Sequence, residues 1–415
     1  MEFSDIAKKA KIASKKIATL STEIKNSALL NIAENLEKNK SEIFRANSED
    51  LEKARILLEK GELNQSTYNR LKLDENKIRD MIQGVKDIAH LDNPIGKILL
   101  KRELDKGLIL TKTSCPIGVL GIIFEARPDV ISQISALAIK SSNAVILKGG
   151  KEAINTNKAI MSFVLEALNN TKGFPENVLT QVFSRDDVNN MLTQDKYIDL
   201  IIPRGGNSLV KYIKENTKIP VLGHSDGVCH IFIDESADFE KSKKIIIDSK
   251  TQYPSACNSV ETILVHKNFK YNEELINYIK ENGVKVIYNP DNWHKEYSDK
   301  VLSYKKVDSL EEAIEHINEF SSGHTESIIT ENKVNAKIFI NSIDSAGVYH
   351  NVSTRFADGF RYGFGAEVGI STNKTHARGP VGLEGLTIYK YSIEGNGEIV
   401  KDYINGTKKF HYKNL

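Results

Sequence analysis

Cys257 is the residue of this chain best placed to act as a nucleophile. It lies in the segment Tyr253–Ser259, among small and polar residues and directly before the apolar run Val260–Val265. Thiolate is the reactive form of cysteine, and polar, accessible surroundings favour it, so this setting suits attack on an activated carbonyl. The alternative is a small core residue, and this fits Cys115 and Cys229, which lie at the end of a predicted strand and inside one.

Two glycine turns between predicted strands and helices could approach the phosphates or ribose of a nucleotide. The first, Lys148–Lys151, reads Lys-Gly-Gly-Lys and carries two positive charges. It matches neither a P-loop nor a Gly-x-Gly-x-x-Gly fingerprint. The second contains Gly205 and Gly206, whose amides could hold a phosphate. For each turn the alternative is an ordinary connection between a strand and a helix.

Four arginines in polar surroundings are candidates for binding an anionic substrate. Arg355, Arg361 and Arg378 fall in one Gly-rich segment, and Arg127 lies in a separate turn. The guanidinium fork binds carboxylate or phosphate through two hydrogen bonds, although each arginine could also be a plain surface residue. No His-Glu-x-x-His or Cys-x-x-Cys pattern is present, so we expect no metal.

The composition indicates a globular protein without a strong charge bias. The chain has 415 residues, with 57 Lys and Arg against 55 Asp and Glu, which gives a net charge of +2. This balance argues against a dedicated nucleic-acid binder. Three cysteines form no disulfide framework, which favours the cytoplasm. No apolar run approaches the ~20 residues of a membrane helix, and the N-terminus lacks the apolar stretch of a signal peptide.

The pattern along the chain predicts helices followed by two α/β segments. Residues 4–92 show helical spacing, and residues 98–113 form a predicted hairpin around Asp105–Gly107. Apolar strands then alternate with helices, and the pattern restarts after Asp248, which indicates two domains with parallel sheets. A late strand over residues 386–391 could pair with the early hairpin.

Four long segments, in the same order, resemble the γ-glutamyl phosphate reductase family of the aldehyde dehydrogenase superfamily. They cover residues 116–130, 255–262, 353–361 and 376–386. The resemblance implies an α/β fold with two doubly wound domains and a small oligomerisation hairpin. It places an NADP-binding domain at 1–97 and 116–226, a catalytic domain at 227–383, and an oligomerisation arm at 98–115 and 384–415.

The resemblance also assigns roles to single residues. Cys257 matches the nucleophile of the superfamily, and Lys148 matches the lysine that meets the adenosine ribose. Lys151 stands where relatives that prefer NAD often carry an acid, so it favours the 2′-phosphate of NADPH. Glu296 aligns with the acid that holds the nicotinamide ribose.

One departure from the superfamily bears on the chemistry. Hydrolytic aldehyde dehydrogenases carry a general-base Glu ahead of the cysteine, whereas the matching stretch Leu222–Gly227 has none. A thioester on Cys257 then lacks a base to activate water, which suits exchange with phosphate. The oxyanion-hole asparagine of the superfamily also lacks a counterpart, so we expect the Cys257 amide and the Asn258 side chain to serve.

The expected activity is the NADPH-dependent reduction of L-glutamyl 5-phosphate to L-glutamate 5-semialdehyde, the second step of proline biosynthesis from glutamate. The expected partners are this acyl phosphate and further copies of the chain, and transfer from a separate glutamate kinase is compatible, since no kinase segment precedes residue 1. Two alternatives are a broad aldehyde dehydrogenase and an inactive nucleotide-binding homologue.

Overall fold

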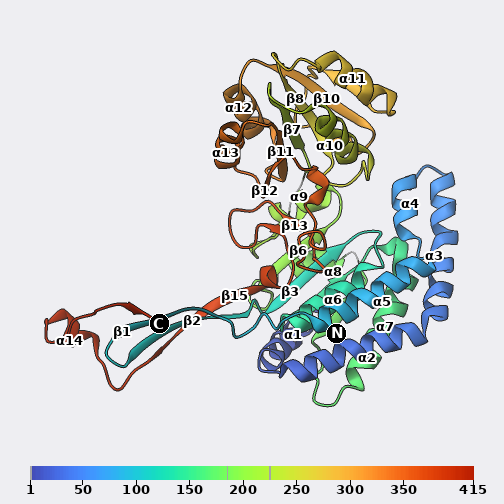
Figure 1. Cartoon of the computed structure of the whole chain (residues 1–415). Helices are drawn as coiled ribbons and strands as arrows, with labels where there is room; N and C mark the ends of the chain where they lie inside the picture. The colour runs from blue at the N-terminus through green and yellow to red at the C-terminus, as the bar shows by residue number, and fades with distance from the viewer. Residues whose placement is uncertain (1, 185, 224–225) are drawn as a thin grey trace. The chain divides into compact units, whose positions relative to one another are not determined.

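A computed structural model describes residues 2–184, 186–223 and 226–415 (Figure 1). The described chain folds into two compact units. The first comprises Met1–Gly205, Ile213–Val221 and Gly382–Leu415, and the second comprises Gly206–Tyr212 and Leu222–Val381. Each unit has a parallel sheet of its own.

Helices fill the start of the first unit, as the periodicity of residues 4–92 predicts. Ser21, Asn64 and Asp74 precede helices and accept a backbone N–H from the third helical residue, which satisfies groups that the helix itself leaves unpaired. Leu29 and Ile32 are fully buried and anchor one of these helices. The helices are α1 (Phe3–Ile17), α2 (Thr22–Lys38), α3 (Lys40–Glu59), α4 (Gln65–Leu71) and α5 (Glu75–His90).

The parallel sheet of the first unit is half of a doubly wound fold. Its strands are β3 (Val119–Phe124), β4 (Ala144–Lys148), β5 (Leu179–Val182) and β6 (Leu200–Arg204), in the spatial order β5-β4-β3-β6. The strand order reverses between β3 and β6, and ligands of such sheets bind beyond the carboxyl ends of the strands at this point. The connecting helices are α6 (Val130–Lys140), η1 (Lys151–Ala153), α7 (Ile154–Asn169), α8 (Asp186–Leu192) and α9 (Asn207–Glu215).

An antiparallel sheet with the order β15-β2-β1-β16 belongs to the first unit and is called the arm here (Figure 1). β1 (Ile98–Asp105) and β2 (Leu108–Pro116) form the predicted hairpin, and β15 (Thr387–Glu394) pairs with β2, so the predicted pairing of the late strand is confirmed. α14 (Val400–Ile404) and β16 (Lys413–Asn414) complete the arm. Its exposed apolar side chains include Ile98, Leu99, Tyr391, Ile393, Val400 and Ile404.

The second unit is built on a parallel sheet with the order β12-β11-β7-β8-β10-β9. β10 was not predicted, because its sequence Val-Leu-Ser-Tyr-Lys-Lys-Val mixes polar residues into the strand. The strands are β7 (Cys229–Ile233), β8 (Val260–His266), β9 (Lys285–Tyr288), β10 (Val301–Val307), β11 (Thr325–Ile329) and β12 (Gly347–His350).

Helices cover both faces of this second sheet. Ile231 and Ile263 pack on one face against α10 and α11, while Phe232 and Leu264 pack on the other face against α12 and α13. Neighbouring residues of a strand point to opposite faces, so both faces are apolar and the strands read as continuous hydrophobic runs. The helices are α10 (Phe239–Thr251), α11 (Asn272–Glu281), α12 (Leu310–Phe320) and α13 (Lys333–Ser342).

The remaining elements are short. They are η2 (Thr354–Phe356), the pair β13 (Ile370–Ser371) and β14 (Gly379–Pro380), and η3 (Glu384–Leu386). Among the residues that the structure describes, no helix combines the length and the apolar character that a membrane crossing requires.

Candidate active site

Cys257 lies in the turn between α10 and β8 and is half-buried. Gly227, just before β7, packs directly against the backbone of this turn. A Cβ atom added to Gly227 would lie 2.5 Å from the Cα of Cys257 and closer still to its carbonyl oxygen. That carbonyl also accepts a hydrogen bond from the Sγ of Cys229, at 3.4 Å. The backbone of Cys257 is therefore fixed from the amino end of β7.

The other two cysteines are poorly suited to nucleophilic attack. Burial raises the pKa of the Cys229 thiol well above its usual range, and the negative charge of Glu326 raises it further. Burial also raises the pKa of Cys115 in β2. Both groups are therefore held as thiols, the unreactive form. None of the three cysteines, all of which the structure describes, forms a disulfide.

Asn258 is buried, and its contacts tie the Cys257 turn to residues 351–357. The Nδ2 of Asn258 donates to the carbonyl oxygen of Ala357 at 2.8 Å. The Oγ1 of Thr354 donates in return to the carbonyl oxygen of Asn258 at 2.7 Å. These two bonds hold the turn in addition to its contact with Gly227. The oxyanion role predicted for Asn258 stays a prediction, and one N–H of its amide is already occupied.

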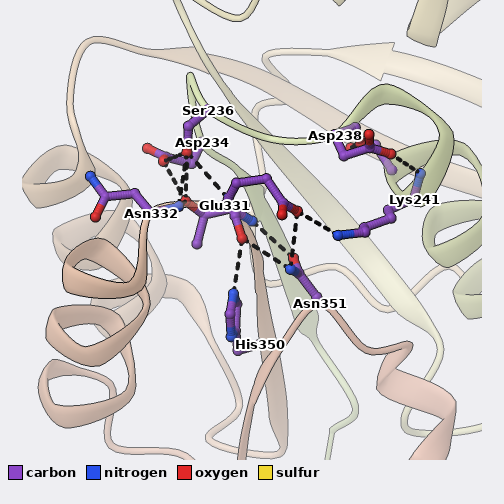
Figure 2. A network of polar contacts seen from close by, with 10 residues as sticks. Asp234, Ser236, Asp238, Lys241, Glu331, Asn332, His350 and Asn351 are labelled. Atoms are coloured by element: carbon purple, nitrogen blue, oxygen red, sulfur yellow. Dashed lines mark hydrogen bonds and ion pairs between the residues drawn. The ribbon is translucent and has the colours of Figure 1, made fainter.

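Residues 351–357, called the strap here, begin at the carboxyl end of β12 and are anchored there by a polar network (Figure 2). Asn351 has a left-handed backbone with φ +56° and reverses the chain. Its Oδ1 accepts from the backbone N of Thr330 and its Nδ2 donates to the carbonyl of Thr330, each at 2.9 Å. Buried Asp234 accepts from the hydroxyl of Thr330 at 2.6 Å. The start of the strap is therefore bound to the ends of β7 and β11.

Two of the predicted substrate arginines lie on or beside the strap. Arg355 is 8% exposed, and its Nε donates to the Oε1 of Gln252 at 2.8 Å. Burial lowers the pKa of Arg355, the charge of Arg361 lowers it further, and the charge of the Cys257 thiolate raises it. The Nη1 of Arg361 donates to the carbonyl of Arg355 at 2.6 Å. The strap thus carries a buried guanidinium whose charge interacts with that of Cys257.

The other two arginines have different surroundings. Arg378 binds Asp344 twice: Nη1 contacts the Oδ1 carboxylate oxygen and Nη2 the carbonyl oxygen, both at 2.8 Å. Arg127 is exposed and belongs to the first unit, after β3. Their substrate-binding roles stay predictions.

A buried ion pair joins α10 and β8, the two elements that the Cys257 turn connects. The Nζ of Lys250 on α10 lies 2.9 Å from the Oε2 of Glu261 on β8, and both side chains are fully buried. Burial raises the pKa of Glu261 to about 7, although Lys250 opposes the rise. The same Oε2 accepts from the backbone N of Tyr297 at 3.2 Å. The Oε2 of the neighbouring Glu296 accepts from the backbone N of Gly227 at 3.1 Å. Glu296 is thus placed beside the Cys257 turn.

The Lys148–Lys151 turn forms the carboxyl end of β4 and the start of η1, as predicted. Its glycines are crowded by side chains: a Cβ at Gly149 would meet the ring of Phe124 at 2.9 Å, and one at Gly150 would overlap the carboxylate of Glu152. The Oε1 of Glu152 accepts from the backbone N of Ala126 at 2.6 Å, which ties this turn to the end of β3. Lys148 thus ends β4 and Lys151 begins η1, so both residues lie at the carboxyl end of that strand.

The second glycine turn joins β6 to α9. The carbonyl of Gly206 accepts from the backbone N of Leu209 at 3.0 Å and so begins the helix, while Gly205 is exposed beside it. In the stretch that lacks the hydrolytic Glu, Leu222–Gly227, positions 224 and 225 lie outside the described residues. No group of three His, Cys, Asp or Glu in the described residues could hold a metal ion.

Comparison with known proteins gives consistent matches. The aldehyde dehydrogenase family model matches residues 1–289. The γ-glutamyl phosphate reductase of Brachyspira hyodysenteriae is 59% identical over 431 aligned positions, covering 100% of both chains. The relative of the same name from Acetivibrio thermocellus is 50% identical over 100% of this chain and 99% of its own. This chain belongs to the γ-glutamyl phosphate reductase family.

Solved structures agree with this membership. The crystal structure of γ-glutamyl phosphate reductase from Thermotoga maritima is 40% identical, with a TM-score of 0.92 over 96% of this chain and 100% of that one. An acetylating aldehyde dehydrogenase from Geobacillus thermoglucosidasius, at 17% identity and a TM-score of 0.70, covers 96% of this chain and 97% of its own and shares the fold. The family resemblance and the aldehyde dehydrogenase-like α/β fold predicted from the sequence are both confirmed.

For this member of the family, sequence reasoning missed the residues that support the site. Gly227, Thr354 and the pair Lys250–Glu261 were not singled out, because their partners lie far away along the chain. The only local signals were weak ones. Glu261 is a charged residue within an otherwise apolar strand, and Gly227 directly precedes another such strand.

Proposed function

We propose that the chain reduces L-glutamyl 5-phosphate to L-glutamate 5-semialdehyde through a thioester on Cys257. Membership of the γ-glutamyl phosphate reductase family assigns the activity, an NADPH-dependent oxidoreductase step of proline biosynthesis. The observation that supports the route is the Cys257 turn: a half-buried thiol, fixed through its backbone, next to a buried arginine.

The thiolate of Cys257 attacks the γ-carbonyl carbon, the bond from that carbon to the phosphate oxygen breaks, and inorganic phosphate leaves. A bound NADPH supplies the hydride that reduces the resulting thioester. The carbon–sulfur bond of the thiohemiacetal then breaks, which releases the semialdehyde and restores the thiolate. Covalent catalysis helps because a thioester accepts hydride more readily than a carboxylate does.

The two lysines of the glycine turn after β4, in the first unit, suit a phosphorylated dinucleotide. Lys148 and Lys151 place two cations at the carboxyl edge of a parallel sheet, where nucleotides bind in doubly wound folds. Lys151 would meet the 2′-phosphate, Gly205 and Gly206 would offer backbone amides, and Glu296 would hold the nicotinamide ribose. In this proposal the NADP-binding domain spans 1–97 and 116–226, the catalytic domain spans 227–383, and the arm spans 98–115 and 384–415.

The substrate carries a phosphate and a carboxylate, which guanidinium groups bind well. Arg355 and Arg361 are proposed to act at the reacting end, because Arg355 faces the charge of Cys257. Arg127 and Arg378 are proposed for the remaining oxyanions. For the tetrahedral intermediate, the Cys257 amide would be one donor and the second Nδ2 hydrogen of Asn258 the other.

The reverse reaction tests this function. The semialdehyde and NADP would be supplied with and without inorganic phosphate, and NADPH formation followed by absorbance. Phosphate-dependent formation that disappears in Cys257→Ala is expected. Formation without phosphate would mean a hydrolytic aldehyde dehydrogenase, and full activity of Cys257→Ala would refute the thioester route. No formation under any condition would favour the inactive homologue.

The proposed partners are further copies of this chain, bound through the arm, and a separate glutamate kinase in the cytoplasm. The exposed apolar side chains of the arm support self-association, since an exposed apolar patch marks an interface. Ile393→Lys with Tyr391→Lys should lower the mass measured by light scattering. An unchanged mass would contradict the role of the arm, and failure of a kinase to co-purify would count against the second partner.

A further inference from the structure

The strap carries Arg355, one of the proposed substrate arginines, and it also binds Asn258, the residue that follows Cys257. From Asn351 it returns along the sheet, where the Oγ of Ser327 donates to the carbonyl of Val352 at 2.8 Å. The hydroxyl of Ser249 on α10 then bonds the hydroxyl of Ser353 at 3.0 Å and accepts from the backbone N of Thr354 at 3.2 Å. The strap is therefore held at successive points before it meets the Cys257 turn.

Thr354 is the residue of the strap whose side chain contacts the Cys257 turn. Its side chain is completely buried, and its Oγ1 donates to the carbonyl of Asn258 at 2.7 Å. The Nδ2 of Asn258 in turn donates to the carbonyl oxygen of Ala357, three residues further along the strap. Asn258, between Cys257 and the start of β8, is thus bonded to the strap through both its backbone carbonyl and its side chain. A displacement of Asn258 would also displace the adjoining Cys257.

We propose that Thr354 is a positioning residue for the nucleophile, acting through its hydroxyl bond to the carbonyl of Asn258. This inference rests on the proposed role of Cys257. The bond holds the Cys257 turn to the strap, which also carries Arg355, a residue whose charge interacts with that of Cys257. Loss of the hydroxyl leaves the fold intact but lets the thiol move away from the guanidinium that stabilises its charge.

The test compares Thr354→Val, which keeps the shape but lacks the donor, with Thr354→Ser, which keeps the donor. Thr354→Val should lower kcat in the phosphate-dependent reverse reaction roughly three- to tenfold, the range expected for one buried hydrogen bond. The KM for NADP should stay within about twofold, because one hydroxyl of the Cys257 turn contributes little to cofactor binding. Thr354→Ser should restore kcat. Thr171→Val, which removes a buried hydroxyl bond to Ala167 in the first unit, is the matched control and should leave kcat unchanged.

Alkylation of Cys257 by iodoacetamide, followed by mass spectrometry across pH, gives the second readout. The alkylation curve of Thr354→Val should move to higher pH, whereas a purely structural loss would lower the amount of folded protein and leave the curve in place. Thr354→Ala removes the same donor without adding a methyl group, and it carries the test if Thr354→Val does not fold.

Two outcomes would overturn the proposal: a wild-type kcat and alkylation curve in Thr354→Val, or a Thr354→Ser variant as impaired as Thr354→Val. Cys257→Ala is measured alongside. If Cys257→Ala keeps full activity, the proposed function itself fails. If Cys257→Ala is inactive while Thr354→Val equals the wild type, only the positioning role fails.

Discussion

The Lys148–Lys151 turn and the Cys257 turn reach their shapes by different means. The first is crowded by side chains, those of Glu152 and Asn157 close by in sequence and the ring of Phe124 on β3. The second is held by bonds to residues that lie 28, 96 and 99 positions away along the chain. Side-chain ends can shift at low cost, whereas a backbone packed against backbone cannot. We therefore expect the Cys257 turn to tolerate far less change than the Lys148–Lys151 turn.

The largest expected effect comes from adding one methyl group to each turn. Gly227→Ala places a Cβ within the backbone of Cys257, so the turn must move and activity should fall by a factor of at least about 100. Gly150→Ala displaces the Glu152 carboxylate and its bond to Ala126, but the atoms nearest the added Cβ belong to that side chain and not to backbone, and activity should fall by less than about tenfold. Steady-state kinetics of both variants measure the two losses of activity. Equal losses would contradict the expected difference in tolerance between the two turns.

The buried ion pair Lys250–Glu261, between the two elements that flank the Cys257 turn, should give the next largest effect. Lys250→Met leaves the Glu261 carboxyl buried without its partner, which should lower the free energy of unfolding by about 3 kcal/mol. Adding Glu261→Gln should recover most of this loss, because the remaining groups are neutral. Urea denaturation measures both variants. A double variant as unstable as the single one would mean that the pair matters through packing and not through charge.

Much of the fold was predictable because its signals are local. The apolar strands, the hairpin around Gly107 and the glycine turn after β4 each follow from neighbouring residues. β10 was missed because Ser303 and the lysines beside it break the apolar run, although Ser303 is buried. At the candidate site, the accessible, polar setting predicted for Cys257 follows from its neighbours in sequence, and its role as the nucleophile stays a prediction. Thr354 and Glu261 were not, because their roles arise from partners that only the folded chain brings together.

The two units should also respond to pH in different ranges. Burial lowers the pKa of His316 on α12 to about 3, so the unfolded chain takes up the proton first as pH falls below about 6.5. Stability of the second unit should drop by about 2 kcal/mol by pH 5, and His316→Phe should remove that loss. Burial lowers the pKa of Lys25 on α2 to about 8, so stability of the first unit should rise between pH 8 and about 10.5.

Unfolding curves at several pH values, followed by hydrogen exchange to separate the two units, measure these slopes. Lys25→Met should flatten the alkaline slope and leave the acid slope unchanged. A wild-type acid slope in His316→Phe would contradict the assignment of the acid range to this residue.

The last prediction concerns the Lys148–Lys151 turn. Lys151→Glu replaces the cation proposed to meet the 2′-phosphate with an acid, which should reduce the preference for NADP over NAD by roughly tenfold or more. Lys158→Glu, on the exposed part of α7, changes the net charge equally and should leave the preference unchanged. The ratio of kcat/KM with NADP to kcat/KM with NAD measures this preference in each variant. An equal shift in both variants would mean that the overall charge, and not Lys151, sets the preference.

Trapping the acyl enzyme tests the central claim most directly. The protein would be incubated with the semialdehyde and NADP without phosphate, then digested and analysed by mass spectrometry. The account predicts a glutamyl adduct on the peptide that contains Cys257, which disappears when inorganic phosphate is added. An adduct on Cys115 or Cys229, or active enzyme without any adduct on Cys257, would contradict it.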